Sequence, residues 1–435
     1  MLTPRASTSW SWGVLSVVAG IVVGVAAAWV GAWALLGGVA LAGVALAARF
    51  PMRSEWTVAA FWVAYTAYET VFSTVTIEGF FYAFYLLLGA GVVVGLAGEG
   101  LRLPAPYLWL QVSFLFVVLL SFVGFADPIG FDVLVRVIAY LFLPLTLAQV
   151  RSPAGVSLVR RAAVVAAGII AVWVVASAIE GDFGYRGNVD VDQNVVAFYI
   201  ALGVAVLLGR LFAGAAEGRV TWVWYGSALA TGVLLYAQLL LASRGVTIAL
   251  AVMLVALAVR ASMLRARALL VVVGVALLVG AALLLPGGQN VVERFEGERV
   301  ESAGSRTPIW AAAWNGYADG DVRQLLVGQG FNSSRVHVQR HLGTVTSTHN
   351  AYLQVLFEFG IVGLLLFLGL HVWVAIGAWR AGLQGLPSFA LLALLMGSNL
   401  SLNTPDGFMF WTAIGLAASA SVWPEARPSV SGGGS

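Results

Sequence analysis

Apolar runs long enough to cross a lipid bilayer recur along almost the whole chain, and they constrain its fold more than any other feature. A membrane-spanning helix needs about 20 apolar residues, and runs of this kind begin near residue 10 and continue to residue 423. The composition agrees, because 60% of the residues are hydrophobic and only 10% are charged. The sequence therefore predicts an all-α, polytopic integral membrane protein.

Counting these runs gives up to fourteen candidate spans, and we expect about 12–14 transmembrane helices. The N-terminal run is not followed by a small-residue cleavage site and a soluble chain, so we expect a retained span rather than a signal peptide. The candidate spans lie near residues 10–29, 31–48, 56–76, 79–98, 106–126, 131–149, 162–179, 194–210, 221–241, 245–259, 268–285, 351–378, 387–402 and 408–423.

Arginine placement gives these spans an orientation. Cytoplasmic loops of membrane proteins are enriched in positive charge, and the chain follows this rule if both termini lie inside the cell. The exceptions on the outer side are Arg136, Arg186, Arg244 and a group between Pro286 and Asn350. Because these outer arginines run against the charge rule, they need another explanation. The arginines on the cytoplasmic side are Arg5, Arg49, Arg53, Arg102, Arg151, Arg160, Arg161, Arg210, Arg219, Arg260, Arg265, Arg267, Arg380 and Arg427.

One long polar segment, residues 286–350, interrupts the apolar runs. It opens with PGGQN, a turn sequence, and then mixes charges of both signs. We therefore divide the chain into four parts. They are a transmembrane helix bundle (1–285), an extracytoplasmic loop (286–350), C-terminal transmembrane helices (351–425) and a flexible tail (426–435).

A short helix is predicted inside this loop, in SRTPIWAAAWNGYADG. Thr307 followed by Pro308 is a favourable pair for an N-cap and a first turn. Trp310, Trp314 and Tyr317 then recur at helical spacing. We expect this helix to lie at the outer membrane interface, with its aromatic rings at headgroup depth.

Several kinds of chemistry are disfavoured by what the chain lacks. It has no cysteine, which excludes thiolate catalysis and cysteine-bound metals. His337 and His341 are four residues apart, but no third ligand is evident and the segment is not clearly helical, so we expect no metal site. No phosphate-binding glycine loop, nucleotide fingerprint or Ser-His-Asp signature is present. We therefore expect no cofactor, no nucleic-acid partner and no nucleotide-sugar donor.

Two outer arginines are candidates for binding an anion. Arg244 stands in LLLASRGVTIALAV between Ser243 and Gly245, where a helix N-terminus and a close backbone approach suit a phosphate. The alternative is an arginine that extends to the outer lipid headgroups. Arg306 precedes the predicted helix at Pro308, and its alternative is a solvated loop charge. Together, two guanidinium groups would neutralise a diphosphate, because each can bind two oxygens.

His349 is a candidate general base. It stands where STHN turns into an apolar helix, which Ser347 or Thr348 can cap, and the positive end of the helix dipole favours the neutral ring. A neutral imidazole can accept a proton near neutral pH. An ordinary capping or loop histidine is an equal alternative on these residues alone. Asn350 would orient the ring or a substrate hydroxyl.

Other polar groups near the outer surface are candidates for substrate contact. Asn194 ends the polar loop EGDFGYRGNVDVDQN, which we expect to line the substrate because it lacks the length and ligand spacing of a calcium site. Arg186 in this loop and Arg136 would contact an anionic sugar or phosphate, and Ser243 would line the same region. Glu358, inside the following span, would pair with an arginine or a hydroxyl group.

Five of these stretches, in this order and at this spacing, resemble the O-antigen ligase and polymerase superfamily. They are DVDQNVVAFYIAL, SRGVTIAL, GSRTPIWAAAW, LLVGQGF and HNAYLQVLFEFGIVGLLLFL, and together they cover about residues 188–370. The resemblance implies a membrane-embedded glycosyltransferase with a GT-C-like fold. The family's two arginines and its histidine fall on Arg244, Arg306 and His349.

The resemblance also implies the reaction and its place. Such enzymes take a glycan from undecaprenyl diphosphate at the outer face of the bacterial cytoplasmic (inner) membrane, so the active site would face the periplasm or the cell exterior. In ligases the acceptor is a sugar hydroxyl on a lipid-anchored core, as in lipopolysaccharide. We expect a metal-independent, inverting glycosyltransferase of this ligase type. The alternatives are a polymerase, which joins carrier-linked repeat units, and, from another class, a transporter of lipid-linked glycans or anions.

Overall fold

The structure is a computed structural model that describes residues 104–123, 153–179, 193–264, a few positions between 271 and 280, 306–343, 346–402 and 408–422. Within these ranges the chain is helical and contains no strand, so the predicted all-α class is confirmed. Two candidate residues, Arg136 and Arg186, lie outside the described residues. So do the four predicted spans before residue 100, the span at 131–149 and most of the span at 268–285.

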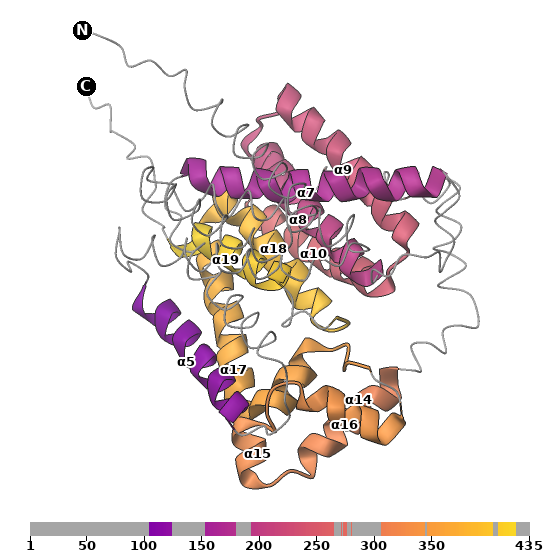
Figure 1. Cartoon of the computed structure of the whole chain (residues 1–435). Helices are drawn as coiled ribbons and strands as arrows, with labels where there is room; N and C mark the ends of the chain where they lie inside the picture. The colour runs from indigo at the N-terminus through magenta and orange to yellow at the C-terminus, as the bar shows by residue number, and fades with distance from the viewer. Residues whose placement is uncertain are drawn as a thin grey trace, which may run out of the picture.

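The described helices match the predicted spans in order and place, although α7 begins at Pro153, before the predicted start at residue 162, and α8 continues to Glu217, past the predicted end at residue 210. Five of them, α7, α8, α9, α10 and α17, are long and apolar enough to cross a membrane, so this is a multi-pass membrane protein (Figure 1). The segment predicted at 245–259 is longer than expected, since α10 has 21 residues. The elements are α5 (Ala105–Val123), α7 (Pro153–Ile179), α8 (Gln193–Glu217), α9 (Trp222–Leu241), α10 (Arg244–Leu264), α14 (Arg306–Ala318), α15 (Val322–Val327), α16 (Ser333–Leu342), α17 (Ala351–Arg380), η3 (Gly382–Gly385), α18 (Leu386–Ser398) and α19 (Phe408–Val422).

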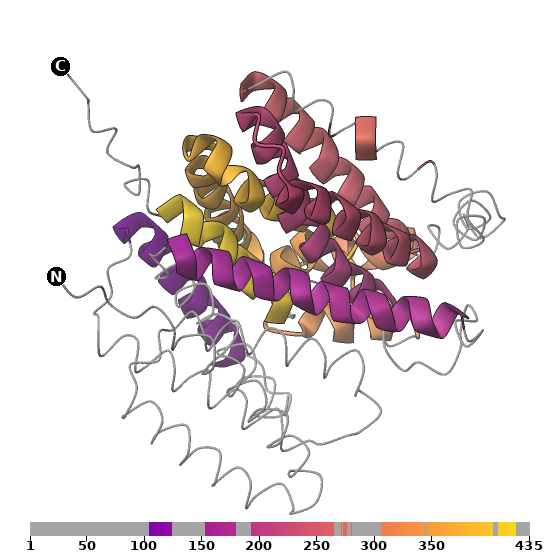
Figure 2. The same ribbon diagram turned by 90° about the horizontal axis from the view of Figure 1, so that it is seen from above.

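Helix α8 lies at the centre of one group of helices and packs against α7, α9, α10 and α18. Most of its residues are buried, as expected for a helix that is apolar on every side. A Cβ at Gly203 would collide with Ala167 of α7, and a Cβ at Gly209 would collide with Pro387 of α18. Small residues let membrane helices approach closely. Helices α5 and α19 both pack against α17 (Figure 2).

Hydrogen bonds at the helix ends show that α10 and α17 run in the same direction and that α18 runs in the opposite one. At one end, Arg260 near the end of α10 donates from Nη2 to Trp379 O near the end of α17, at 2.6 Å. At the other end, Ala351 N at the start of α17 donates to Asn399 O just after α18, at 2.8 Å. We refer to these as the Arg260 end and the Asn399 end of the bundle.

Three short helices, α14, α15 and α16, pack around the first turns of α17 and lie together at its lower end in Figure 1. Ile309 and Ala313 of α14, Val338 of α16 and Phe357 of α17 form a buried apolar cluster there. The sequence predicts only the first of these helices. Helix α16 is polar overall, and Val338 anchors it by packing into the cluster.

Helix α17 is interrupted at Gly360, where φ is 67° and ψ is −170°. A break of this kind removes the helical hydrogen bonds to the carbonyls of Phe357 and Glu358. The backbone N–H groups of Gln329 and Gly330 replace them and donate to these carbonyls at 3.0 and 3.1 Å. Buried backbone groups need such partners. The glycine turn LLVGQGF therefore docks on the break and fixes the segment of α14–α16 to α17.

Candidate functional site

Each of the three candidate catalytic residues lies at the start of a helix. Arg244 is the first residue of α10, Arg306 is the first residue of α14, and His349 lies two residues before α17. Helix α14 begins one residue earlier than its predicted cap, so Thr307 and Pro308 lie in its first turn. A helix start carries partial positive charge and presents backbone N–H groups, so all three positions favour an anion.

His349 has a φ of 48°, a left-handed conformation that is uncommon for residues other than glycine. The next residue, Asn350, caps α17, because its side-chain oxygen accepts from Leu353 N at 3.0 Å. The prediction that Ser347 or Thr348 caps this helix is wrong. Thr348 Oγ1 instead donates to Asn350 O at 3.1 Å.

Helix α14 holds the loop that carries His349. Trp310 Nε1 donates to Thr348 O at 2.9 Å, and Thr348 is fully buried. Arg306 lies four residues before Trp310 and so shares its face of the helix. The His349 ring is half-buried, and its Nε2 lies 3.4 Å from Thr346 Oγ1. The start of α14 is therefore fixed beside the candidate base.

Arg244 is positioned by the residues on either side of it. Ser243 is buried, and its Oγ donates to Asn194 Oδ1 of α8 at 2.7 Å. Gly245 packs so closely on Ser401 that a Cβ would collide with the Ser401 side chain. The start of α10 is therefore held between α8 and the segment that follows α18.

Short contacts link the three helix starts to one another. The segment after α18 touches α10 through Ser401 and binds the start of α17 through Asn399 O. The loop before α17 in turn binds α14 through Thr348 and Trp310. The candidate residues gathered at the Asn399 end are therefore Arg244, Arg306, His349, Asn350, Ser243 and Asn194.

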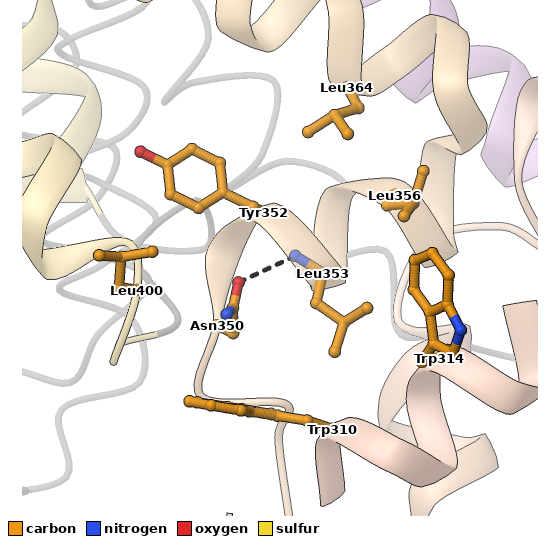
Figure 3. Close-up of a pocket in the computed structure, with 8 residues that line it drawn as sticks. All are labelled: Trp310, Trp314, Asn350, Tyr352, Leu353, Leu356, Leu364 and Leu400. Atoms are coloured by element: carbon orange, nitrogen blue, oxygen red, sulfur yellow. Dashed lines mark hydrogen bonds between the residues drawn. The ribbon is translucent and has the colours of Figure 1, made fainter. Parts of the chain in front are cut away.

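An apolar groove of about 380 Å³ opens beside this arrangement. Figure 3 shows Leu353 of α17 between the indoles of Trp310 and Trp314 of α14, with Asn350 at the edge. Because the lining is almost entirely aliphatic and aromatic, the groove suits an apolar group. Asn350 is its polar corner, next to His349. The other lining residues are Tyr352, Leu356, Leu364 and Leu400.

The buried carboxylate of Glu358 joins α16 to α17. Ser334 Oγ of α16 donates to Glu358 Oε1 at 2.6 Å, and Gln354 Nε2 lies 3.4 Å from the same oxygen. Of the two kinds of partner expected from the sequence, the structure gives a hydroxyl group. A buried carboxylate needs donors of this kind, so Glu358 helps to hold α16 against α17.

The histidine pair lies on α16, in a segment that proves to be helical. The rings of His337 and His341 are in contact at a tilt of 31°, with their centroids 4.2 Å apart. Burial, followed by the charge of His341, lowers the pKa of His337 below 6.5. Among the described residues, no group of three or more histidine, aspartate or glutamate side chains lies close enough to hold a metal ion.

Trp310 and Thr348 belong to the site although their sequence positions do not predict it. The spacing of Trp310 predicts a ring at headgroup depth, but its indole N–H also needs an acceptor when it is half-buried. That requirement is the one signal in the sequence, and it does not indicate which carbonyl will accept. The partner, Thr348 O, comes from a loop 38 residues away.

Residues 229–368 match the family model described as O-antigen ligase. The matched part runs from α9 through α10 and α14–α16 to α17 beyond its break, and it contains Arg244, Arg306 and His349. A comparison with curated proteins found no match. Over this part of the chain, the match supports the O-antigen ligase and polymerase superfamily predicted from the sequence.

Proposed function

We propose that this protein is a metal-independent, inverting glycosyltransferase of the O-antigen ligase type. It moves a glycan from undecaprenyl diphosphate to a sugar hydroxyl of a lipid-anchored core, at the outer face of the bacterial cytoplasmic membrane. The observation that carries the proposal is that two arginines and a histidine, from three separate helix starts, gather at one end of the bundle within the matched domain.

Arg244 and Arg306 would hold the diphosphate of the carrier. Negative charge grows on this group as the bond to the anomeric carbon breaks, and charge-assisted hydrogen bonds from guanidinium groups strengthen as it does. The positive ends of α10 and α14 add to the same field. Stabilised in this way, the diphosphate can leave without a metal ion.

His349 would act as the general base on the acceptor. Its imidazole takes the proton of the acceptor hydroxyl while that oxygen forms a bond to the anomeric carbon. The electron pair of the broken carbon–oxygen bond leaves with the diphosphate. A single displacement from the opposite face inverts the anomeric centre.

The neighbouring polar residues would support this step. Asn350 borders the groove beside His349 and would contact the acceptor. The hydrogen bond between Ser243 and Asn194 fixes the backbone before Arg244, and we propose that both side chains border the donor sugar. Arg136 and Arg186 stay predictions as further substrate contacts.

The apolar groove supports a lipid-linked donor. It begins at Asn350 and continues along α17 to Leu364, beyond the helix break. We propose that the first isoprene units of the carrier lie there, with the diphosphate at the polar corner. Trp310 and Trp314 would then sit at headgroup depth, as tryptophan side chains commonly do.

The placement of charge supports an outward-facing site. Arginines gather near the Arg260 end of the bundle, the end opposite the candidate site, and a positively charged end faces the cytoplasm. We keep the four-part division of the chain as a proposal. The described arginines near the Arg260 end are Arg160, Arg161, Arg210, Arg219, Arg260 and Arg380.

The test is product formation by the purified protein with EDTA present. The protein is given a glycan on undecaprenyl diphosphate and two competing acceptors, a lipid core and a second carrier-linked glycan, and products are identified by mass spectrometry. We expect the product to be the glycan attached to the lipid core, with the anomeric configuration inverted relative to the donor. Longer carrier-linked glycans would instead indicate a polymerase. Transport across vesicles without bond formation, or a strict need for added metal, would contradict the proposal.

A further inference from the structure

The indole of Trp310 takes part in two contacts at once. Its ring forms one wall of the apolar groove (Figure 3), and its Nε1–H donates to Thr348 O at 2.9 Å. Thr348 is fully buried and immediately precedes His349. The hydrogen bond therefore runs from the helix that begins at Arg306 to the peptide next to the proposed base.

The backbone is held on both sides of His349. Before it, Thr348 is bound by Trp310, and after it, the capping of α17 by Asn350 fixes the chain. Between these two restraints, His349 has a φ of 48°. A residue in this sparsely populated conformation persists where its surroundings hold it there. Releasing one restraint would let the backbone relax and turn the imidazole away from its present direction.

We propose that Trp310 is a positioning residue, whose indole N–H fixes the peptide before His349 so that the imidazole points at the acceptor hydroxyl. This role rests on the proposed function, in which His349 is the base. The hydrocarbon part of the ring belongs to the groove wall and contributes to donor binding. The N–H orients the imidazole of His349. Donor binding by the ring and orientation of the base by the N–H can therefore be separated by experiment.

The sharpest variant replaces Trp310 by benzothienylalanine, in which a sulfur atom takes the place of the N–H and the shape of the ring is kept. Trp310→Phe is the genetically encoded counterpart. Because a base misplaced by about 1 Å can cost about 100-fold, we expect kcat to fall about 10- to 100-fold in both. The KM for the donor should stay within about twofold for benzothienylalanine, because the groove wall is intact.

Trp224→Phe is the matched control. Trp224 Nε1 donates to Leu211 O at 3.1 Å, and the side chain is half-buried like that of Trp310, but it lies near the Arg260 end. This variant removes the same kind of hydrogen bond from the same kind of environment. We expect its kcat and KM to match those of the unmodified protein.

A benzothienylalanine variant with unchanged kcat would overturn the positioning role, as would an equal loss of kcat in Trp224→Phe. Assaying His349→Asn beside them separates this inference from the proposed function. Full activity in His349→Asn would overturn the proposed function itself. An inactive His349→Asn together with an unchanged benzothienylalanine variant would overturn the role of Trp310 alone.

Discussion

His349 combines a left-handed backbone with a half-buried ring, so a substitution must separate loss of the base from loss of the turn. Asparagine tolerates this backbone conformation but cannot take up a proton. We expect His349→Asn to fold normally and to lower kcat by about 100- to 10,000-fold. The check is a steady-state transfer assay on purified protein, with circular dichroism to verify folding. Near-normal kcat would remove the assignment of the base.

The glycine at the break in α17 shows how one residue can set the form of an element. Gly360 has a backbone conformation that is open mainly to glycine. A Cβ there would also collide with the backbone of Leu326 and Gly328. No such collision is possible at Gly343, which caps α16 with a φ of 72° and has open space where a Cβ would point.

These two glycines form a matched pair of variants. We expect Gly343→Ala to lower the free energy of unfolding by about 1–2 kcal/mol, the cost of a left-handed alanine. Gly360→Ala adds a backbone collision and should cost about 3 kcal/mol or more. Thermal unfolding in detergent measures both. Equal stability of the two variants would mean that the glycine turn does not dock on α17 as described.

At the scale of the element, α16 should respond to pH through His337. Its pKa is lowered by burial and by His341, so the folded state binds this proton less tightly than the unfolded chain does. The stability from neutral His337 is complete above about pH 6.5 and is lost as the pH falls towards the lowered pKa. We expect faster amide hydrogen exchange in α16 at about pH 5.5 than at about pH 7.5, after correction for the intrinsic rate.

His337→Gln is the control for this effect, because glutamine keeps a polar side chain that does not titrate. Its exchange in α16 should change much less between the two pH values. An equal pH response in the unmodified protein and the variant would show that another group controls the stability of α16.

Within the described residues, the sequence predicts the membrane helices better than it predicts the segment of α14–α16, for a physical reason. A span such as α8 is specified locally, because its apolar length predicts where it lies, although the helix continues to Glu217, past the predicted end at residue 210. Helix α16 depends on Val338 meeting Phe357, which is 19 positions further along the chain. The break at Gly360 is hidden in an apolar run and depends on the distant glycine turn.

The candidate site also has parts that the sequence predicts and parts that it does not. Arg244, Arg306 and His349 are visible in the sequence because charged and titratable side chains are rare in this chain. The direction of the His349 ring is not visible, because it depends on a hydrogen bond from Trp310. A charged or titratable residue can be recognised in the sequence by itself. The contacts that orient its side chain form only when the helices pack.

In the whole molecule, the proposed function requires the Asn399 end of the bundle to face outward. The chain has no cysteine, so single cysteines can be introduced without removing others. Asp319 is exposed just after α14, and Arg219 lies between α8 and α9 with a side chain that is 78% exposed. The two variants are therefore Asp319→Cys and Arg219→Cys. In intact cells with a permeable outer layer, we expect a membrane-impermeant maleimide to label only Asp319→Cys. The reverse pattern would place the candidate site in the cytoplasm.

The central claim is that two guanidinium groups from different helices stabilise one departing diphosphate. The most direct measurement is the glycan transfer rate of purified Arg244→Ala and Arg306→Ala, with Arg335→Ala as a control on the exposed face of α16. We predict that each of the first two variants loses about 100- to 1,000-fold in kcat, while Arg335→Ala transfers normally. Normal transfer by either Arg244→Ala or Arg306→Ala, or an equal loss in all three variants, would contradict the account.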